Sequence, residues 1–406
     1  MTDPHETPST TTVGSHIDVM PERFVAGGEA LGHGPDGRVV FVRGGLPGDA
    51  VSVEIVEQKG EWSRGVVTTV TRGAPERVEP PCLRRREGCG GCDWQHLAVD
   101  RQLPAKLEIV RDALRRTGRL DDPTLTLGAT VDDRGYRTTI RVVGGRDGRA
   151  AFRQDRSHDT VSANGCIIAH PALLPVIDRI RITPELEVSL RVSAATGQMT
   201  ARWDRRRGEV DGLPRSVYSG ANAHLTERVA GHDLRVSAGA FFQSGPAAAN
   251  LLVDAVRRAA PEVADARTVL DAYAGVGLFA VAVAPATAKV ITVETSRAAV
   301  GDAQVNLAGR DARVEQCEMS TWRPERGLTI DVAIADPARS GLGRPGSAAV
   351  VAAGPQVLAL VSCDPVALAR DTELLGHSGY RHDGTEVLDL FPHTHHVECV
   401  TRFVRS

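Results

Sequence analysis

A cysteine and a glutamate near the C-terminus are the residues whose types and settings best suit covalent chemistry. Cys363 lies in a Ser-Cys-Asp-Pro run directly after the apolar segment 357–361, which predicts a buried strand. Glu398 follows 35 residues later in a His-Val-Glu run. At the carboxyl end of a strand in an open α/β sheet, a thiol with a lowered pKa acts as a nucleophile and a nearby carboxylate as a base. A cysteine in this setting alone more often packs in the core, so the surrounding motifs decide between the two interpretations.

A strand, a glycine turn and a helix are predicted over residues 269–280. Asp271 closes the strand, and the turn that follows carries Gly275 and Gly277, which permit close approach of the backbone to a ligand. The third spaced glycine of the dinucleotide fingerprint is missing, which disfavours a nicotinamide cofactor. Glu294 ends the next strand, where a carboxylate accepts hydrogen bonds from a ribose diol, and Asp336 ends a third strand over the same crevice. Together these acids and glycines predict an S-adenosylmethionine site.

Three of the seven cysteines, Cys82, Cys89 and Cys92, form a Cys-x6-Cys-x2-Cys run. Two cysteines separated by two residues hold one metal centre when glycines let the backbone curl around it. The fourth ligand must come from elsewhere in the chain, and Cys166 is the best candidate. Four thiolates suit structural zinc or a [4Fe–4S] cluster, and the spacing alone slightly favours zinc. Chance clustering of thiols in a reduced cytoplasm is the alternative to both.

The pattern of apolar residues predicts a multidomain chain. Residues 1–16 are expected to form a disordered tail. Short alternating strands over 17–72 predict a small OB-like β-barrel of the kind that binds oligonucleotides, although a barrel can also serve only for packing. Residues 73–238 are expected to form an α+β central domain with the cysteine cluster, an RNA-binding surface and a helix over 101–116. Alternating strands and helices over 239–406 predict a doubly wound parallel α/β sheet.

Composition is ordinary for a soluble protein, with 42% hydrophobic and 24% charged residues. No apolar run is long enough to cross a bilayer and the N-terminus is unlike a signal peptide, so we expect a cytoplasmic monomer without membrane contact. A net charge of −3 gives no overall signature of a nucleic-acid binder, so any such binding needs a local basic face. Arg205, Arg206 and Arg207 form the densest basic point and are candidates for phosphate contact or for a solvated hairpin tip.

From residue 17 onward the chain resembles the RNA uracil-C5 methyltransferases, and most closely the branch that acts on 23S rRNA. The resemblance implies a TRAM barrel, a [4Fe–4S] cluster in the central domain and a class I S-adenosylmethionine-dependent methyltransferase domain. It places Cys363 on the nucleophile and Glu398 on the catalytic base. It also places the cluster ligands on Cys82, Cys89, Cys92 and Cys166. The implied cofactor-binding residues are Gln243 in a Phe-Phe-Gln run, Tyr273, Gly275, Gly277, Glu294 and Asp336.

The resemblance implies formation of 5-methyluridine in RNA, with 23S rRNA favoured as the substrate and tRNA as the alternative. In that reaction the cysteine adds to C6 of uracil, C5 takes the methyl group, and the glutamate assists elimination. Two positions depart from the family pattern. Ala338 replaces the second proline of Asp-Pro-Pro-Arg, and Ala274 replaces a cysteine before the first motif glycine. Neither departure removes a reacting group.

Two further interpretations compete with an active RNA methyltransferase. An RNA-binding relative without catalysis would keep the barrel and the cluster, but the intact Cys363, Glu398, Asp336 and Gln243 argue against it. A DNA cytosine methyltransferase shares the thiol addition but places its nucleophile in a Pro-Cys pair. Here the order is Cys363-Asp364-Pro365, so the sequence favours RNA.

Overall fold

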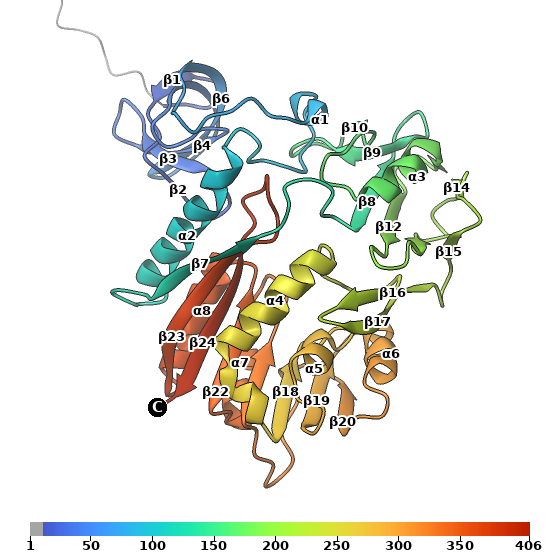
Figure 1. Ribbon diagram of the computed structural model, residues 1–406. Helices are drawn as coiled ribbons and strands as arrows, with labels where there is room; N and C mark the ends of the chain where they lie inside the picture. The colour runs from blue at the N-terminus through green and yellow to red at the C-terminus, as the bar shows by residue number, and fades with distance from the viewer. Residues whose placement is uncertain (1–10) are drawn as a thin grey trace, which may run out of the picture.

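The computed structural model describes residues 11–406, which form a barrel, a central domain and a larger α/β domain (Figure 1). Residues 1–10 of the predicted tail lie outside the described residues. Residues 11–16 do not form the expected disordered segment, since they pack on the barrel. The Gly14 amide donates to the Ile55 carbonyl, and the Ile55 amide donates to the Ser15 carbonyl. The first strand begins at His16.

The barrel is a six-stranded sheet in the order β1-β5-β6-β4-β3-β2. Its strands are β1 (His16–Val19), β2 (Arg23–Phe24), β3 (Ala30–His33), β4 (Val39–Arg43), β5 (Ala50–Lys59) and β6 (Trp62–Arg72). Alternate residues of β4 and β5 point inward and form a core with Val40, Val42 and Val53. Gly32 lets β3 meet the end of β1, because a β-carbon there would lie 2.7 Å from Val19 Cγ1. The short strands predicted over 17–72 are therefore found in one six-stranded sheet, which starts one residue earlier.

The central domain is built on a six-stranded sheet in the order β10-β9-β8-β12-β13-β15. Its elements are α1 (Leu83–Arg86), β8 (Thr139–Gly144), β9 (Ala150–Arg153), β10 (Thr160–Ser162), η1 (Pro171–Leu173), α3 (Leu174–Arg179), β11 (Arg181–Ile182), β12 (Glu187–Val192), β13 (Met199–Arg202), β14 (Val210–Asp211) and β15 (Val217–Ser219). One face of this sheet is covered by α3, with Ile177, Val188 and Leu190 in the shared core. The other face carries polar side chains.

The α/β domain contains an eight-stranded sheet in the order β20-β19-β18-β21-β22-β24-β23-β7. Its strands are β18 (Thr268–Ala272), β19 (Lys289–Glu294), β20 (Ala312–Gln316), β21 (Val332–Ala335), β22 (Val357–Ser362), β23 (Tyr380–Asp389) and β24 (Glu398–Arg405), joined at the edge by β7 (Leu125–Thr130). The five strands from β18 to β22 run parallel, and β24 is antiparallel to β22 and β23. The chain order reverses between β18 and β21, which is where open α/β sheets bind ligands.

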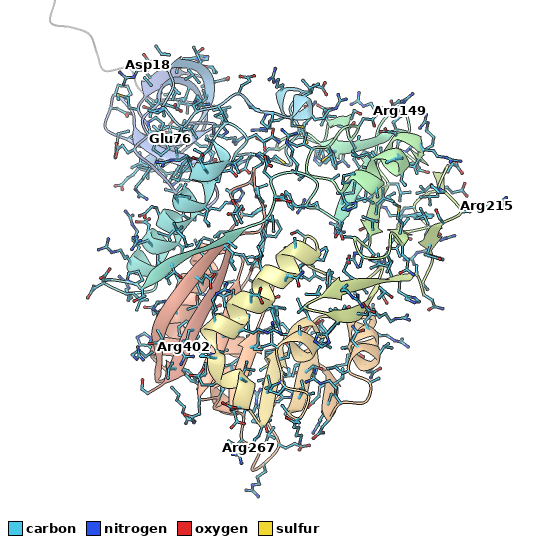
Figure 2. The ribbon with its side chains drawn as sticks, in the orientation of Figure 1. Asp18, Glu76, Arg149, Arg215, Arg267 and Arg402 are labelled. Carbon is cyan, nitrogen blue, oxygen red and sulfur yellow. The ribbon has the colours of Figure 1, made fainter. Side chains whose placement is uncertain are left out.

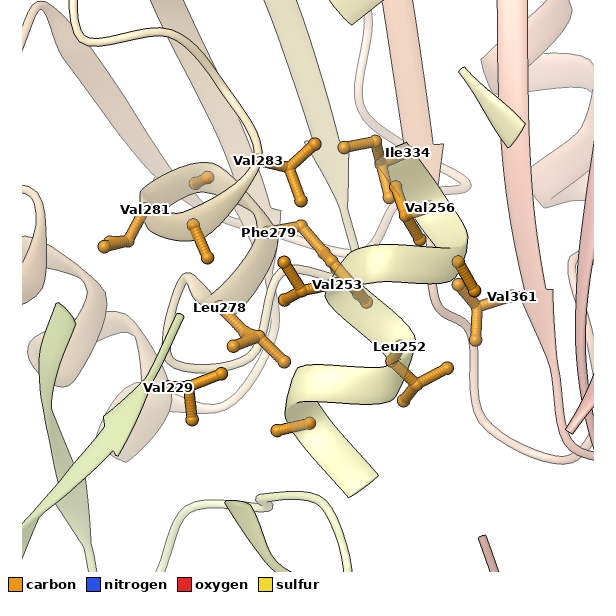
Figure 3. Close-up of a cluster of buried hydrophobic side chains, with 14 of the residues drawn as sticks. Val229, Leu252, Val253, Val256, Leu278, Phe279, Val281, Val283, Ile334 and Val361 are labelled. Atoms are coloured by element: carbon orange, nitrogen blue, oxygen red, sulfur yellow. The ribbon is translucent and has the colours of Figure 1, made fainter. Parts of the chain in front are cut away.

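Helices cover both faces of this sheet, so its central strands are apolar on both sides. The helices are α2 (Val99–Arg116), α4 (Pro246–Ala259), α5 (Leu278–Ala282), α6 (Arg297–Asn306), α7 (Gly343–Ala353) and α8 (Pro365–Gly376), with the short η2 (Pro261–Asp265) after α4. Within β22, Ala359 and Val361 face the core under α4 and α5, shown in Figure 3, whereas Leu358 and Leu360 face the core under α2, α7 and α8. Because successive residues of β22 face two different apolar cores, the run 357–361 contains no polar residue.

Three elements that we expected in the central domain pack on the α/β domain instead: α2, β7 and a hairpin. Helix α2 lies against α8 and β23, and β7 pairs in parallel with β23 at the edge of the large sheet. The hairpin of β16 (His224–Val229) and β17 (His232–Ser237) packs against α4 and α6. The expected helix is found and begins two residues earlier, at Val99. The partner strand of β7 lies about 260 residues away in the sequence, a pairing that local patterns do not encode.

The carboxyl ends of the parallel strands point toward the barrel and the central domain (Figure 1). Arg267 precedes β18 and marks the opposite end of the molecule in Figure 2. Residues at the strand ends therefore lie between the three domains. Within residues 11–406, no helix combines the length and the apolar character needed to cross a membrane.

Candidate active site

The antiparallel pairing of β22 with β24 brings Cys363 and Glu398 together. Ser362 pairs with Cys399 as the last partners in this ladder. The next residue on each strand is Cys363 on one side and Glu398 on the other, so the register places the two side by side. Glu398 is 4% exposed, whereas Cys363 is half-buried. The thiol is thus open to a ligand while the carboxyl group is shielded from water.

Burial dominates the electrostatics of this pair. It raises the pKa of the Cys363 thiol to about 12, with further contributions from the carboxylates of Glu398 and Asp336, while Arg339 opposes the shift. Burial and the charge of Asp336 also raise the pKa of Glu398 well above its ordinary value, again opposed by Arg339. Without a ligand, therefore, both groups favour their neutral forms. A positive charge bound beside Cys363 would favour the thiolate form.

Asp336 and Gln243 lie beside this pair, at the end of the neighbouring strand β21. Asp336 follows β21 and is hydrogen bonded by Gln243, whose Nε2 donates to Asp336 Oδ2 at 3.2 Å. Burial raises the pKa of Asp336 to about 7, and the Gln243 bond acts against this rise. Gln243 comes from the segment before α4, so residues about 90 apart in the sequence meet here. An amide beside a carboxylate offers both a donor and acceptors to a polar ligand.

The glycine turn after β18 has the conformation that its sequence predicts. Gly275 and Gly277 have φ of 55° and 85°, in the left-handed region that favours glycine. Glu294 holds this turn, because its Oε2 accepts from the Gly275 amide at 2.9 Å. Its Oε1 accepts from the amides of Thr295 and Ser296 and from the Thr295 hydroxyl. Oε2 keeps one free acceptor position for a ribose hydroxyl, and the Thr295 hydroxyl can turn away from Oε1 to make room for another.

Two other residues near the predicted cofactor site have their side chains directed into the protein. Asp271 is completely buried inside β18, where its Oδ2 accepts from the Ala280 amide at 2.8 Å and burial raises its pKa to about 7. Tyr273 has a left-handed φ of 62°, and its hydroxyl lies 2.6 Å from where a Gly346 β-carbon would stand. Asp271 therefore stabilises the turn and helix α5, and Tyr273 packs toward α7.

Arg339 is a site residue that the sequence patterns did not identify, although it ends the Asp-Pro-Ala-Arg motif after β21. The Arg339 guanidinium contacts the His396 ring, with Nη2 2.9 Å from Nε2, and its charge acts on both Cys363 and Glu398. Arg339 is exposed, so its guanidinium is accessible to a phosphate. The spacing of the motif from the end of β21 was the signal that could have identified it.

The four predicted cluster ligands line one cavity of about 380 Å³ in the central domain: Cys82, Cys89, Cys92 and Cys166. Burial and the adjacent thiols of Cys166 and Cys89 raise the pKa of Cys92 to about 12. Among the residues that the structure describes, no three His, Cys, Asp or Glu side chains are arranged around a single metal ion. Four thiols around one cavity match the donor set of an iron–sulfur cluster or of zinc.

Comparison with known proteins gives relatives along nearly the whole chain. An "Uncharacterized RNA methyltransferase" of Streptomyces avermitilis is 33% identical over 428 residues, covering 96% of this chain and 98% of the relative. The 23S rRNA (uracil(1939)-C(5))-methyltransferase of Aeromonas salmonicida is 30% identical over 413 residues, covering 90% and 92%. No protein-family model matches the chain.

A solved structure shares the fold. The crystal structure of the Pyrococcus abyssi tRNA (uracil-54, C5)-methyltransferase in complex with S-adenosyl-L-homocysteine aligns with a TM-score of 0.72 and 24% identity. The alignment covers 95% of this chain and 99% of the other chain. The shared architecture thus includes the β-rich N-terminal region as well as the methyltransferase domain.

Proposed function

Because this chain belongs to the RNA uracil-C5 methyltransferase family, we propose that it converts a uridine of 23S rRNA into 5-methyluridine. The observation that carries this proposal is the strand register that sets Cys363 beside Glu398. A thiol and a carboxyl group side by side at the end of a buried strand suit addition to a pyrimidine followed by proton removal.

Cys363 supplies the nucleophile of the proposed reaction. Its thiolate forms a bond to C6 of uracil, and the electrons of the C5–C6 double bond move to C5 and the C4 carbonyl. C5 then takes the methyl group, whose bonding electrons stay on the sulfur that it leaves. The target base must leave its stack so that attack on C6 and approach to C5 are both open. S-adenosylmethionine, when bound, supplies the methyl group and a positive sulfonium charge.

Glu398 completes the reaction as the base. It removes the proton from C5, the C5–C6 double bond reforms, and the bond from C6 to Cys363 breaks. The carboxyl group must be ionised before this step, and once ionised its raised pKa makes it bind the proton more strongly than an exposed carboxylate does. Asp336 and Gln243 border the same edge and would bind the polar parts of cofactor or base.

The cofactor would bind between the glycine turn and the ends of β19 and β21. Gly275 and Gly277 allow its amino-acid part to approach the backbone, and Glu294 accepts from the ribose diol. The sulfonium charge would favour the ionised forms of Asp336 and Glu398. Tyr273 would contribute through its backbone or ring edge, since its hydroxyl points toward α7. The second candidate substrate is tRNA, which the shared fold with the Pyrococcus abyssi enzyme favours.

The N-terminal barrel would act as a TRAM domain, and the central cavity would hold a [4Fe–4S] cluster on Cys82, Cys89, Cys92 and Cys166. Four thiols around one cavity support this assignment. The cavity belongs to the central domain, apart from the Cys363 thiol, so these cysteines are assigned no step in methyl transfer.

Protein purified without oxygen is expected to contain about four iron atoms per chain and to absorb broadly in the visible range, as four thiolates around one cubane require. Iron and sulfide analysis with visible spectroscopy measures this. Cys166→Ser should lower the iron content, whereas Cys317→Ser, outside the cavity, should leave it unchanged. Stoichiometric zinc without iron in the anaerobic protein would contradict the cluster.

Deletion of the gene is expected to remove one 5-methyluridine from the RNA of its host. Nucleoside mass spectrometry of separated 23S rRNA and tRNA, followed by mapping of the fragment, identifies the substrate. Loss from 23S rRNA supports the first proposal, and loss from tRNA supports the second. An unchanged 5-methyluridine content in both RNAs would show that the chain does not make this modification.

A further inference from the structure

A basic cavity of about 700 Å³ opens on the polar face of the central sheet. We call it the Trp203 cradle, and it is lined by Arg141, Arg202, Trp203, Arg205 and Arg207 among others. Two of its arginines lie on one row across the sheet. Ser189 of β12 pairs with Arg141 of β8 on one side and with Arg202 of β13 on the other, so all three share a face.

The cradle concentrates positive charge in a chain whose net charge is −3. Its lining carries Arg206 in addition to the four arginines named above, but only two acidic residues, Asp204 and Glu187. Asp204 pairs with Arg206. Within residues 11–406, Arg141, Arg202 and Arg207 form no ion pair, so their charges are free for a polyanion. This is the local basic face that nucleic-acid binding by an acidic chain requires.

Trp203 gives the cradle a surface for stacking. The Arg205 guanidinium lies over the indole ring, 4.8 Å from its centroid, and Arg205 Nη2 donates to Ser219 Oγ at 3.1 Å. An aromatic ring and a guanidinium plane are the two surfaces on which unpaired RNA bases stack. Arginines beside an aromatic ring therefore fit a nucleotide better than they fit an isolated phosphate.

The cradle leads toward the candidate active site. A β-carbon on Gly239 would lie 3.5 Å from Arg202 Nε, so Arg202 reaches the segment before α4. Along this segment Phe241 is 71% exposed, and Gln243 donates to Asp336. Arg141 also lines the thiol cavity, so the basic face continues toward the cysteine cluster.

We propose that the Trp203 cradle binds a single-stranded segment of the RNA substrate next to the target uridine. Arg141, Arg202 and Arg207 contact its phosphates, and one base stacks on the Trp203–Arg205 pair. The proposal rests on the proposed function for the identity of the RNA. The cradle holds the strand and takes no part in bond making, so it determines affinity and not the rate of the chemical step.

Arg207→Glu is expected to weaken binding of a fluorescein-labelled, mixed-sequence single-stranded RNA oligonucleotide to the full-length protein. The slope of log K against log salt concentration should fall in magnitude by about 0.7 for each phosphate that the variant no longer neutralises. Fluorescence anisotropy over a range of potassium chloride concentrations measures both quantities. Arg267→Glu is the matched control, because it makes the same charge change on an exposed arginine at the far end of the molecule (Figure 2). That variant should bind like wild type.

The stacking interaction is tested with two substitutions of one residue. Trp203→Ala is expected to weaken oligonucleotide binding about tenfold, whereas Trp203→Phe, which keeps a ring, should retain most of the affinity. Trp203 also packs partly on the central core, so thermal unfolding followed by circular dichroism checks the fold of both variants. Arg205→Ala removes the other stacking surface from the exposed side and tests the same interaction without touching the core.

Methylation assays separate this proposal from the proposed function. If wild type makes 5-methyluridine, the cradle variants should raise KM for RNA and leave kcat nearly unchanged. If wild type makes no 5-methyluridine but the variants lose RNA affinity as expected, the proposed function is wrong and RNA binding by the cradle is supported. Wild-type affinity and salt slope in Arg207→Glu and Arg205→Ala, or no RNA binding by wild type, would overturn the cradle.

Discussion

Protein in which Glu398 is replaced by glutamine is expected to remain covalently attached to its RNA. Addition of Cys363 and methyl transfer precede the step that needs the base, so both can still occur. Glutamine cannot accept the C5 proton, and elimination stalls with the bond from sulfur to C6 intact. Turnover should fall by about 100- to 10,000-fold, the usual contribution of a general base. A protein band shifted by bound RNA on denaturing electrophoresis, removed by nuclease digestion, is the measurement.

Cys363→Ala is the matched control for this experiment. It removes the nucleophile, so neither adduct nor 5-methyluridine should form, and the double variant Cys363→Ala/Glu398→Gln should also give no shifted band. Both single variants should bind S-adenosylhomocysteine like wild type, because the Gly275 turn and Glu294 are untouched. Normal turnover by Glu398→Gln would refute the assignment of the base. Methylation by Cys363→Ala would refute thiol addition altogether.

The strands that position this pair were predictable because their apolar patterns are strong and local. The runs before Cys363 and around Asp271 are buried on both faces of a central sheet, and such strands show few polar residues. The pairing of β22 with β24 was not predictable. Nothing in the sequence near Glu398 states that β24 enters the sheet antiparallel to β22, yet that register sets the distance between the two reacting groups.

The candidate site shows the same division between residue type and spatial arrangement. Gly275 and Gly277 were predictable because only glycine adopts their backbone conformation without strain. The directions of the acidic side chains were not predictable. Asp271 and Glu294 are both acidic residues near strand ends. Asp271 is buried and accepts from the Ala280 amide, whereas Glu294 accepts from the Gly275 amide and so holds the turn. Arg339 gained its role only when the fold brought the loop of His396 beside it.

That loop, residues 390–397, leads into Glu398, and a completely buried ion pair anchors its start. Lys106 of α2 lies with its Nζ 2.6 Å from Asp389 Oδ1, and both side chains are 0% exposed. Lys106 Nζ also donates to the Phe391 carbonyl at 3.3 Å. A second anchor joins the loop to the cysteine cluster, since His395 Nδ1 lies 2.6 Å from Oδ2 of Asp93, the residue after Cys92. Lys106 therefore connects α2 to the segment that carries the candidate base.

Lys106→Met is expected to destabilise the fold by about 3–5 kcal/mol, because it leaves the Asp389 carboxylate buried without its partner. Methionine keeps most of the volume of the lysine stem, so the loss of stability measures the charge and not a cavity. The double variant Lys106→Met/Asp389→Leu removes both charges and should recover most of the stability, since apolar replacements of a buried ion pair are often neutral. Urea unfolding followed by circular dichroism measures the difference, and hydrogen exchange over 389–398 locates it. If the single variant unfolds at the same urea concentration as the double variant, the pair does not hold this loop.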